Sequence, residues 1–280
     1  MIIDGKVLSE KIKQALRLAL LAQGKKLRLD VVWVGDNAVS EKYVERKKKI
    51  GEEVGVEVVV HELISDITET DLVGEIEKLN NDERVGGIIV QLPLPARMSS
   101  DGPIQIDEQK ILNLVSANKD VDALSQEAKV LSPTVGAIKE ILERNNVNFK
   151  NKKIVVLGKG KLVGRPVAMW LTQEGGEVSM IDSKTSEIDS SKLLQTADII
   201  VSGVGKPGLI KPASIKTGAI LIDAGTSESG GQLKGDADPA CAEKCFLFTP
   251  VPGGVGPLTV VMLFKNLLEL ASPSPRSNLK

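Results

Sequence analysis

Tyr43 and Lys47 lie four positions apart in a segment of helical period. At that spacing both side chains project from one face of a helix, so they can meet the same ligand. A lysine whose pKa is lowered by burial and by nearby cations can take up and release protons near neutral pH. The alternative is a solvated run of charge, because Arg46, Lys48 and Lys49 flank Lys47.

Two further polar residues are expected in loops. Gln91 ends the apolar run GGIIV, and the Leu-Pro-Leu-Pro that follows stops the strand at the carboxyl edge of its sheet, where ligands of open α/β sheets bind. Asp122 belongs to the stretch KDVD, and a buried carboxylate there would suit a paired contact with an amino-amidine such as a pterin ring. An amide that caps a strand end and a solvated linker are the alternatives.

Residues 249–259, TPVPGGVGPLT, are the least generic segment. Their prolines and glycines predict a preset loop with exposed N–H groups, against which a flat ring could lie. A helix should follow, with Thr259 as its N-cap. A tight connection without a ligand is the alternative.

Residues 158–164, GKGKLVG, follow the apolar strand KKIVVL and precede an apolar helix that begins near Pro166. Glycines let the backbone approach a pyrophosphate, and the N-terminus of the helix offers free N–H groups. The spacing GxGxxxG is one residue longer than the common fingerprint, so a plain strand-to-helix turn remains the alternative.

Asp182 ends the next expected strand, 24 residues after Gly158. A Rossmann unit places an acidic residue at about this position, against the adenosine ribose. The sequence therefore favours a dinucleotide site. The alternative for Asp182 is a polar residue that starts the turn Asp-Ser-Lys.

Short runs rich in Val and Ile alternate with helical segments, which predicts an α/β fold with parallel sheets. In the first half, helices are expected at 38–54 and 69–80, and strands at 29–34, 56–63 and 87–92. In the second half, a helix is expected at 135–145, and strands at 153–157, 177–181, 198–202, 219–223 and 245–249. We therefore expect an N-terminal α/β domain (1–118), a Rossmann-type domain (119–258), a closing helix (259–271) and a flexible tail (272–280).

The 280 residues carry 36 Lys and Arg against 37 Asp and Glu, so no net field favours nucleic acid or an anionic membrane as a partner. Cys241 and Cys245 are the only cysteines, and one CxxxC pair lacks the further ligands of a zinc site, so we expect reduced thiols and no metal. Charges interrupt the N-terminal sequence too early for a signal peptide, and no apolar run approaches the ~18 residues that span a bilayer. A cytoplasmic protein is expected.

Together these segments resemble the bifunctional methylenetetrahydrofolate dehydrogenase/methenyltetrahydrofolate cyclohydrolase family. The matching stretches occur in family order, from about Gly5 to Leu270: SEKYVERKKK, VQLPLP, KDVDAL, VVLGKGKLVGRP, ADIIVSGVGKP, GAILIDAG, GDAD and TPVPGGVGPLT. The combination of QLPLP, KDVD and PGGVGP at compatible spacing is specific.

The resemblance implies two reactions: oxidation of 5,10-methylenetetrahydrofolate with NAD(P), and hydrolysis of the methenyl product to 10-formyltetrahydrofolate. It implies that Lys47 is the catalytic lysine, that Gln91 bonds to it, that Tyr43 packs against the folate and that Asp122 holds the pterin. It also implies an interdomain cleft, a homodimer and a closing helix that returns to the first domain. Folate-binding residues would include Pro252, Gly253 and Gly254, and cofactor-binding residues would be Gly158, Lys159, Gly160, Val163, Gly164, Asp182, Ser183, Gly205 and Thr226.

The sequence departs from the family pattern at the adenosine end of the cofactor site. Lys159-Gly160 stands where the family usually has Arg-Ser, and Asp182 stands where it often has His. The family commonly uses NADP, whereas Asp182 and Gly160 favour NAD. Elsewhere, Ser132-Pro133-Thr134-Val135 replaces Pro-Cys-Thr-Pro, and Ala123 replaces the glycine of KDVDG.

Two other functions share parts of this pattern. A shikimate-type dehydrogenase would have an α/β layer, a dinucleotide domain and a catalytic lysine, but would not need QLPLP or PGGVGP. A catalytically silent dinucleotide sensor would keep the glycine turn and lose Tyr43, Lys47, Gln91 and Asp122, all of which are present.

Overall fold

The computed structural model describes the chain except for residues 25, 100–101, 105, 230–231 and 273–280. The chain divides into two compact units. The first, here called the Lys47 unit, consists of Lys11–Pro133 and the segment from Val260 onward. The second, the Gly158 unit, consists of Met1–Glu10 and Thr134–Thr259. This division lies fifteen residues beyond the expected boundary at 118, since it falls after Pro133, and it joins the N-terminal segment to the dinucleotide half.

The Lys47 unit contains a parallel sheet of three strands in the order β2-β1-β3. In chain order its elements are α1 (Gly5–Gln23), which begins in the other unit, β1 (Arg28–Val34), α2 (Ala38–Val54), β2 (Glu57–Leu63), α3 (Glu69–Asn81), β3 (Gly87–Val90), β4 (Arg97–Ser99), β5 (Gly102–Ile104) and α4 (Glu108–Leu112). Strands β4 and β5 form an antiparallel hairpin. The structure confirms the predicted α/β class.

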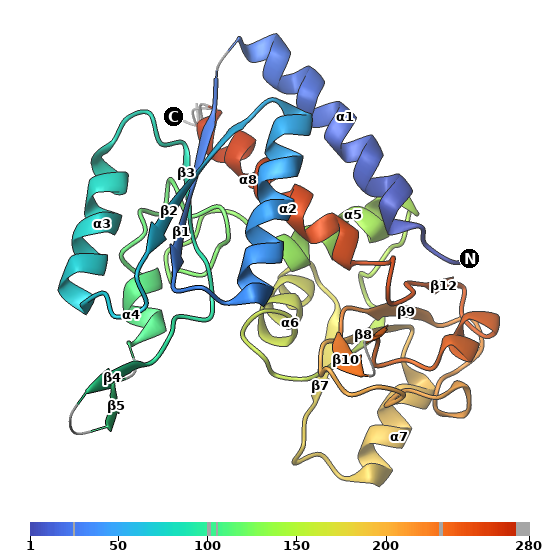
Figure 1. The fold of residues 1–280 in the computed structure, drawn as a ribbon. Helices are drawn as coiled ribbons and strands as arrows, with labels where there is room; N and C mark the ends of the chain where they lie inside the picture. The colour runs from blue at the N-terminus through green and yellow to red at the C-terminus, as the bar shows by residue number, and fades with distance from the viewer. Residues whose placement is uncertain (25, 100–101, 105, 230–231, 273–280) are drawn as a thin grey trace, which may run out of the picture. The chain divides into compact units, whose positions relative to one another are not determined.

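Helices cover both faces of this sheet, with α3 on one side and α2 on the other (Figure 1). The side chains of Leu72, Ile76 and Leu79 project from α3 into a core formed with the β1 residues Val32 and Val34. Because side chains alternate along a strand, Leu29 and Val31 face the opposite side, where they are also fully buried. Burial of both faces of β1 explains why this central strand reads as a largely apolar run.

The Gly158 unit contains a parallel sheet of five strands in the order β12-β9-β8-β6-β7. In chain order its elements are α5 (Pro133–Arg144), β6 (Lys153–Leu157), α6 (Gly164–Gln173), β7 (Glu177–Ile181), α7 (Glu187–Thr196), β8 (Ile199–Ser202), η1 (Pro212–Ser214), β9 (Ile220–Asp223), β10 (Ser227–Ser229), β11 (Gln232–Lys234), η2 (Pro239–Glu243), β12 (Leu247–Phe248) and the start of α8 (Gly256–Ala271). The chain leaves β6 for β7 on one side and returns to β8 on the other, so the topological switch point lies between β6 and β8.

The N-terminal segment extends this sheet beyond β12. Ile2 forms a parallel bridge with Phe248, and the amide of Ile3 donates to the Phe248 carbonyl at 2.9 Å. This pairing explains why the first ten residues group with the dinucleotide half of the chain.

Some features differ from the sequence expectations. Helix α8 begins at Gly256, and the Thr259 hydroxyl donates to the Gly256 carbonyl within the helix, so Thr259 is not the N-cap. The long amphipathic α1 and the short hairpins β4-β5 and β10-β11 were not expected. The expected tail lies outside the described residues from position 273 onward.

Candidate functional site

Lys47 lies on α2 and is nearly fully buried, with 6% of its surface exposed. Its Nζ donates to Gln91 Oε1 at 2.6 Å. The Gln91 side-chain amide in turn donates to the Leu92 carbonyl at 2.8 Å, which holds the amide with its oxygen toward Lys47. The structure therefore brings together a lysine and the amide at the end of β3, as expected at this edge of the sheet.

Burial lowers the pKa of Lys47, and the nearby Asp122 carboxylate opposes that shift. The expected contribution from neighbouring cations is not found among the described residues. Lys48 pairs instead with Glu45 at 2.8 Å on the helix surface. A lysine with a lowered pKa exchanges protons more readily near neutral pH.

Asp122 lies in a segment that runs beside β3. The Ile88 amide donates to the Lys119 carbonyl at 2.7 Å, and Ile88 bridges to Asp120 in parallel. Burial raises the pKa of Asp122 to about 6, Lys47 lowers it, and Asp120 raises it further. Lys47, Gln91 and Asp122 therefore form one interacting cluster, here called the Lys47 cluster.

Two residues outside the sequence predictions hold the loop that carries Asp122. The buried Asn266 of α8 donates from Nδ2 to the carbonyls of Val121 and Leu131, at 2.8 and 2.9 Å. The buried Asp120 carboxylate accepts from the Ser125 amide at 2.9 Å. The role of Asn266 is not readable locally, because this residue lies 145 positions from Val121.

Tyr43 lies one helical turn before Lys47, and 48% of its surface is exposed. An aromatic ring this exposed, next to a buried lysine, is available to pack against a flat ligand. Its role in folate binding stays a prediction.

Pro252, Gly253 and Gly254 belong to the Gly158 unit. The Gly253 carbonyl accepts from the Gly5 amide at 2.7 Å, and Gly253 has φ of +109°. A Cβ on Gly254 would lie 2.6 Å from the Pro250 carbonyl oxygen, so only glycine fits this turn. The loop is tightly folded against the N-terminal segment, and Pro252 is an exposed residue of it.

The glycine turn after β6 is built for close backbone packing. Gly158 has φ of +93°, and a Cβ on Gly164 would lie 2.0 Å from the Gly158 carbonyl oxygen. Helix α6 then begins without a side chain that caps its N-terminus at Val163. Because the turn lies at the switch point, the free N–H groups at the start of α6 could receive a pyrophosphate. Gly160, unlike Gly164, has open space where a side chain would stand, so its backbone can be approached closely.

Lys159 and Asp182 form an ion pair, with Nζ 2.7 Å from Oδ2. They follow β6 and β7, which are adjacent strands. The hydrogen bond from Lys159 lowers the pKa of Asp182 to about 2, and the Lys184 amide contributes to the shift. Ser183 follows as an exposed residue of the same turn.

The loops after β8 and β9 contain the remaining cofactor candidates. Gly205 has φ of +77°, and a Cβ there would lie 3.3 Å from the Thr226 carbonyl oxygen, so these two residues are neighbours. Two buried carboxylates, Asp223 and Asp236, lie beneath these loops. Sequence reasoning gave them no role, although both occur in the stretches GAILIDAG and GDAD.

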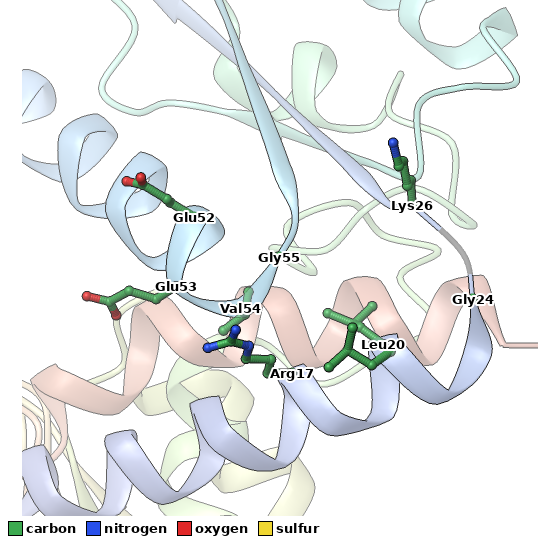
Figure 2. A pocket seen from close by; sticks show the side chains of 9 residues that line it. Arg17, Leu20, Gly24, Lys26, Glu52, Glu53, Val54 and Gly55 are labelled. Carbon is green, nitrogen blue, oxygen red and sulfur yellow. The ribbon is translucent and has the colours of Figure 1, made fainter.

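A pocket of about 450 Å³ lies elsewhere in the Lys47 unit, where the ends of α1 and α2 meet (Figure 2). None of the predicted site residues lines it; its lining consists of Arg17, Leu20, Leu21, Gly24, Lys26, Glu52, Glu53, Val54 and Gly55.

Three findings bear on other kinds of site. Among the described residues, no group of three or more His, Cys, Asp or Glu side chains could hold a metal ion. Cys241 and Cys245 are free and buried. No helix in the described part of the chain has the length and apolar character to cross a membrane.

A glycine turn at the switch point of a parallel sheet is typical of enzymes that use nucleotide cofactors. Residues 132–274 match the family model described as the NAD(P)-binding domain of tetrahydrofolate dehydrogenase/cyclohydrolase, and residues 3–122 match the model of its catalytic domain. The chain belongs to the tetrahydrofolate dehydrogenase/cyclohydrolase family. This membership favours a folate enzyme over both alternatives, the shikimate-type dehydrogenase and the silent sensor.

Individual relatives agree with the family models. The bifunctional protein FolD of Staphylococcus haemolyticus is 38% identical over 95% of both chains. The bifunctional FolD of Campylobacter jejuni has a solved structure with 34% identity and a TM-score of 0.90, covering 96% of this chain and 98% of that one. The Trypanosoma brucei enzyme, solved with NADP cofactor and an inhibitor, has 32% identity and a TM-score of 0.86, covering 96% of each chain.

Proposed function

We propose that this chain oxidises 5,10-methylenetetrahydrofolate with a nicotinamide dinucleotide and hydrolyses the resulting methenyl cation to 10-formyltetrahydrofolate. The observation that carries the proposal is the Lys47 cluster, in which a buried lysine is held by Gln91 and influenced by Asp122. Membership of the family supplies the substrate class.

Lys47 acts in the hydrolytic step. Its lowered pKa lets the amine accept a proton from the water that attacks the methenyl carbon, and a proton then returns to the ring nitrogen as its bond to that carbon breaks. Gln91 is a positioning residue for the amine. Its oxygen accepts from Nζ while its amide group is anchored on the Leu92 carbonyl, so Nζ is directed rather than free to rotate.

Several residues are assigned to folate binding. Asp122 accepts hydrogen bonds from the pterin N–H groups, and Tyr43 packs against the ring system. Pro252, Gly253 and Gly254 offer a flat surface with little side-chain bulk. The half-buried position of Asp122 and the exposed ring of Tyr43 support these roles.

The dinucleotide is held by the turn 158–164 and by the loops that contain Ser183, Gly205 and Thr226. When bound, it supplies the acceptor for the hydride of the methylene carbon. The packing of Gly164 against Gly158 supports this assignment, since any larger residue at 164 would collide with the Gly158 carbonyl oxygen and displace α6 from the glycine turn.

We further infer that NAD is accepted at least as well as NADP. Asp182 can accept hydrogen bonds from the ribose hydroxyls of NAD, and its negative charge repels a 2′-phosphate. Lys159 pairs with Asp182, so the positive charge of this lysine is already engaged. Gly160 offers no hydroxyl donor.

Homodimeric assembly and a cytoplasmic location complete the proposal. The resemblance to the family supports the dimer, and the two unpaired cysteines suit a reducing compartment. Light scattering on the purified protein measures the assembly directly, and a mass equal to one chain would contradict it.

The deciding experiment follows absorbance of the purified protein with 5,10-methylenetetrahydrofolate and either cofactor, and separately with methenyltetrahydrofolate alone. The first reaction reports the dehydrogenase and the second the cyclohydrolase. Turnover in both is expected. Failure of both, in protein that is folded by circular dichroism, would exclude the proposed function.

A further inference from the structure

Asp236 is a fully buried carboxylate beneath the loop that follows β8. Its Oδ2 accepts from the Ser202 hydroxyl at 2.6 Å and from the Val204 amide at 2.8 Å. Its Oδ1 accepts from the Lys206 amide at 2.7 Å. Three donors from one short loop therefore converge on one side chain, and no Lys or Arg side chain of the described residues forms an ion pair with it.

Asp223, the last residue of β9, also accepts hydrogen bonds from two backbone amides. Its Oδ1 accepts from the Gly225 amide at 3.0 Å, and its Oδ2 accepts from the Ala237 amide at 2.8 Å. Burial raises the pKa of Asp223 to about 6, against the effect of the backbone donors. This carboxylate ties the loop after β9 to the segment that contains Asp236.

Two glycines let these segments interlock. A Cβ on Gly225 would lie 2.1 Å from Asp236 Oδ2, and a Cβ on Gly235 would lie 2.2 Å from Asp223 Oδ2. The backbone beside each carboxylate thus packs directly on the other carboxylate. Such contacts leave no room for the two loops to move independently.

The loops held in this way lie at the switch-point edge of the sheet. Strand β8 is adjacent to β6, and a Cβ on Gly203 would lie 2.5 Å from Val163 in the glycine turn. Gly205 and Thr226 lie in the two loops that the carboxylates hold. These are the loops that the proposed function assigns to the dinucleotide.

We propose that Asp236, supported by Asp223, is a positioning residue that holds the loop 203–206 in the conformation that receives the dinucleotide. The inference rests on the proposed function, because it takes these loops as part of the cofactor site. A carboxylate offers acceptors to all three donors, whereas an amide would turn an NH₂ group toward at least one of them. The loop would then lose its preset shape, and cofactor affinity would fall while turnover at saturating cofactor is kept.

The test compares D236N with wild type and with D238N as a matched control. Asp238 lies two residues further on and is partly exposed, and its side chain accepts from the Ala240 amide at 2.9 Å, a contact that asparagine can keep. Titration calorimetry gives the Kd of NAD and of NADP, and steady-state kinetics separate KM from kcat. Hydrolysis of methenyltetrahydrofolate, which needs no dinucleotide, is measured in parallel.

In D236N we expect the Kd and KM of both cofactors to rise about tenfold, with kcat and the cyclohydrolase rate within twofold of wild type. In D238N all four values should be unchanged. The milder S202A, which removes one donor, should raise the cofactor Kd about threefold and decides the question if D236N does not fold.

An unchanged cofactor Kd in the folded variants would overturn the inference, as would a cyclohydrolase rate that falls in step with cofactor affinity. These outcomes are distinct from failure of the proposed function. If the proposed function were wrong, the wild-type protein itself would bind no dinucleotide, or would turn over neither 5,10-methylenetetrahydrofolate nor methenyltetrahydrofolate.

Discussion

Lys159 Nζ lies 2.7 Å from Asp182 Oδ2, across the ends of the adjacent parallel strands β6 and β7. The pair forms where a Rossmann unit receives the adenosine ribose. The hydrogen bond from Lys159 lowers the pKa of Asp182 to about 2, so the carboxylate stays ionised at neutral pH. A 2′-phosphate at this place would have to compete with Asp182 for Lys159.

The first prediction follows from that competition. Asp182→Ser removes the negative charge and frees Lys159, so kcat/KM with NADP should rise about tenfold relative to NAD. The measurement is kcat/KM for both cofactors in wild type and variant. Lys161→Met is a control, because this exposed lysine of the same turn is two residues beyond the paired one. A strong wild-type preference for NADP that the substitution leaves unaltered would mean that Asp182 faces away from the ribose.

The second prediction concerns Lys47. Lys47→Met removes the proton-handling amine and keeps apolar bulk, so methenyltetrahydrofolate hydrolysis should fall by about 10²-fold or more. The folate Kd should stay close to that of wild type. Lys48→Met is the matched control, since Lys48 pairs with Glu45 on the helix surface and its loss should leave the rate unchanged. Undiminished hydrolysis in Lys47→Met would show that Lys47 has no catalytic role and is only part of a run of charged residues.

The third prediction is a pH dependence of folate binding. The pKa of Asp122 is raised to about 6 by burial, and only the ionised carboxylate accepts from two pterin N–H groups. The folate KM should therefore rise as pH falls through about 6. Asp122→Ala should weaken folate binding by ~1–3 kcal/mol at neutral pH and remove this dependence. A variant with the wild-type Kd would place Asp122 outside the folate site.

Protonation of Asp122 should have opposite effects on folate binding and on stability: it weakens binding but stabilises the folded chain. The folded pKa of Asp122 lies above the usual pKa of an aspartic acid, so the favourable contribution of the protonated carboxyl is full below that usual pKa and is lost as pH rises through about 6. Asp122→Asn should therefore gain melting temperature relative to wild type above this range, and the difference should shrink below it. Thermal scans at several pH values measure this. A difference that does not change with pH would show that Asp122 titrates normally in the folded protein.

The sequence predicted the inner parallel strands well because β3, β8 and β9 are buried on both faces and so read as apolar runs. It predicted α2 at its observed bounds, and it identified the Lys47–Gln91 pair through the resemblance. Helix α1 has buried residues at Ile12, Leu16 and Leu20, and this helical spacing could have predicted the helix from the sequence. Strands of three residues, such as those of β4-β5, are too short to show a period.

Contacts between distant positions explain the rest. Ser202 and Asp236 are 34 residues apart, and their hydrogen bond depends on how two strand ends meet in the fold. Likewise, four adjacent cationic residues from Arg46 to Lys49 look equivalent in sequence. Only the packing of α2 decides that Lys47 is the buried one.

The last prediction tests the loop that carries Asp122. Ala123 has φ of +54°, in the left-handed region, where the family has glycine and where an L-residue pays about 1–2 kcal/mol. The Asp120 carboxylate imposes this turn from one side through the Ser125 amide, and Asn266 holds the Val121 carbonyl from the other.

Ala123→Gly removes the backbone strain, which stabilises the folded chain. It also gives the unfolded chain more conformational freedom, which lowers the unfolding free energy by about 0.4–1 kcal/mol. The net change in unfolding free energy should therefore be small and positive. The folate KM should stay within twofold of wild type, because the loop already has the shape that glycine would adopt. Ala123→Val is the contrasting variant, since a β-branched residue is strongly disfavoured at positive φ. It should lower the melting temperature and raise the folate KM while leaving the cofactor Kd unchanged. Wild-type melting temperature and folate KM in Ala123→Val would mean that the backbone at this position is not left-handed in solution.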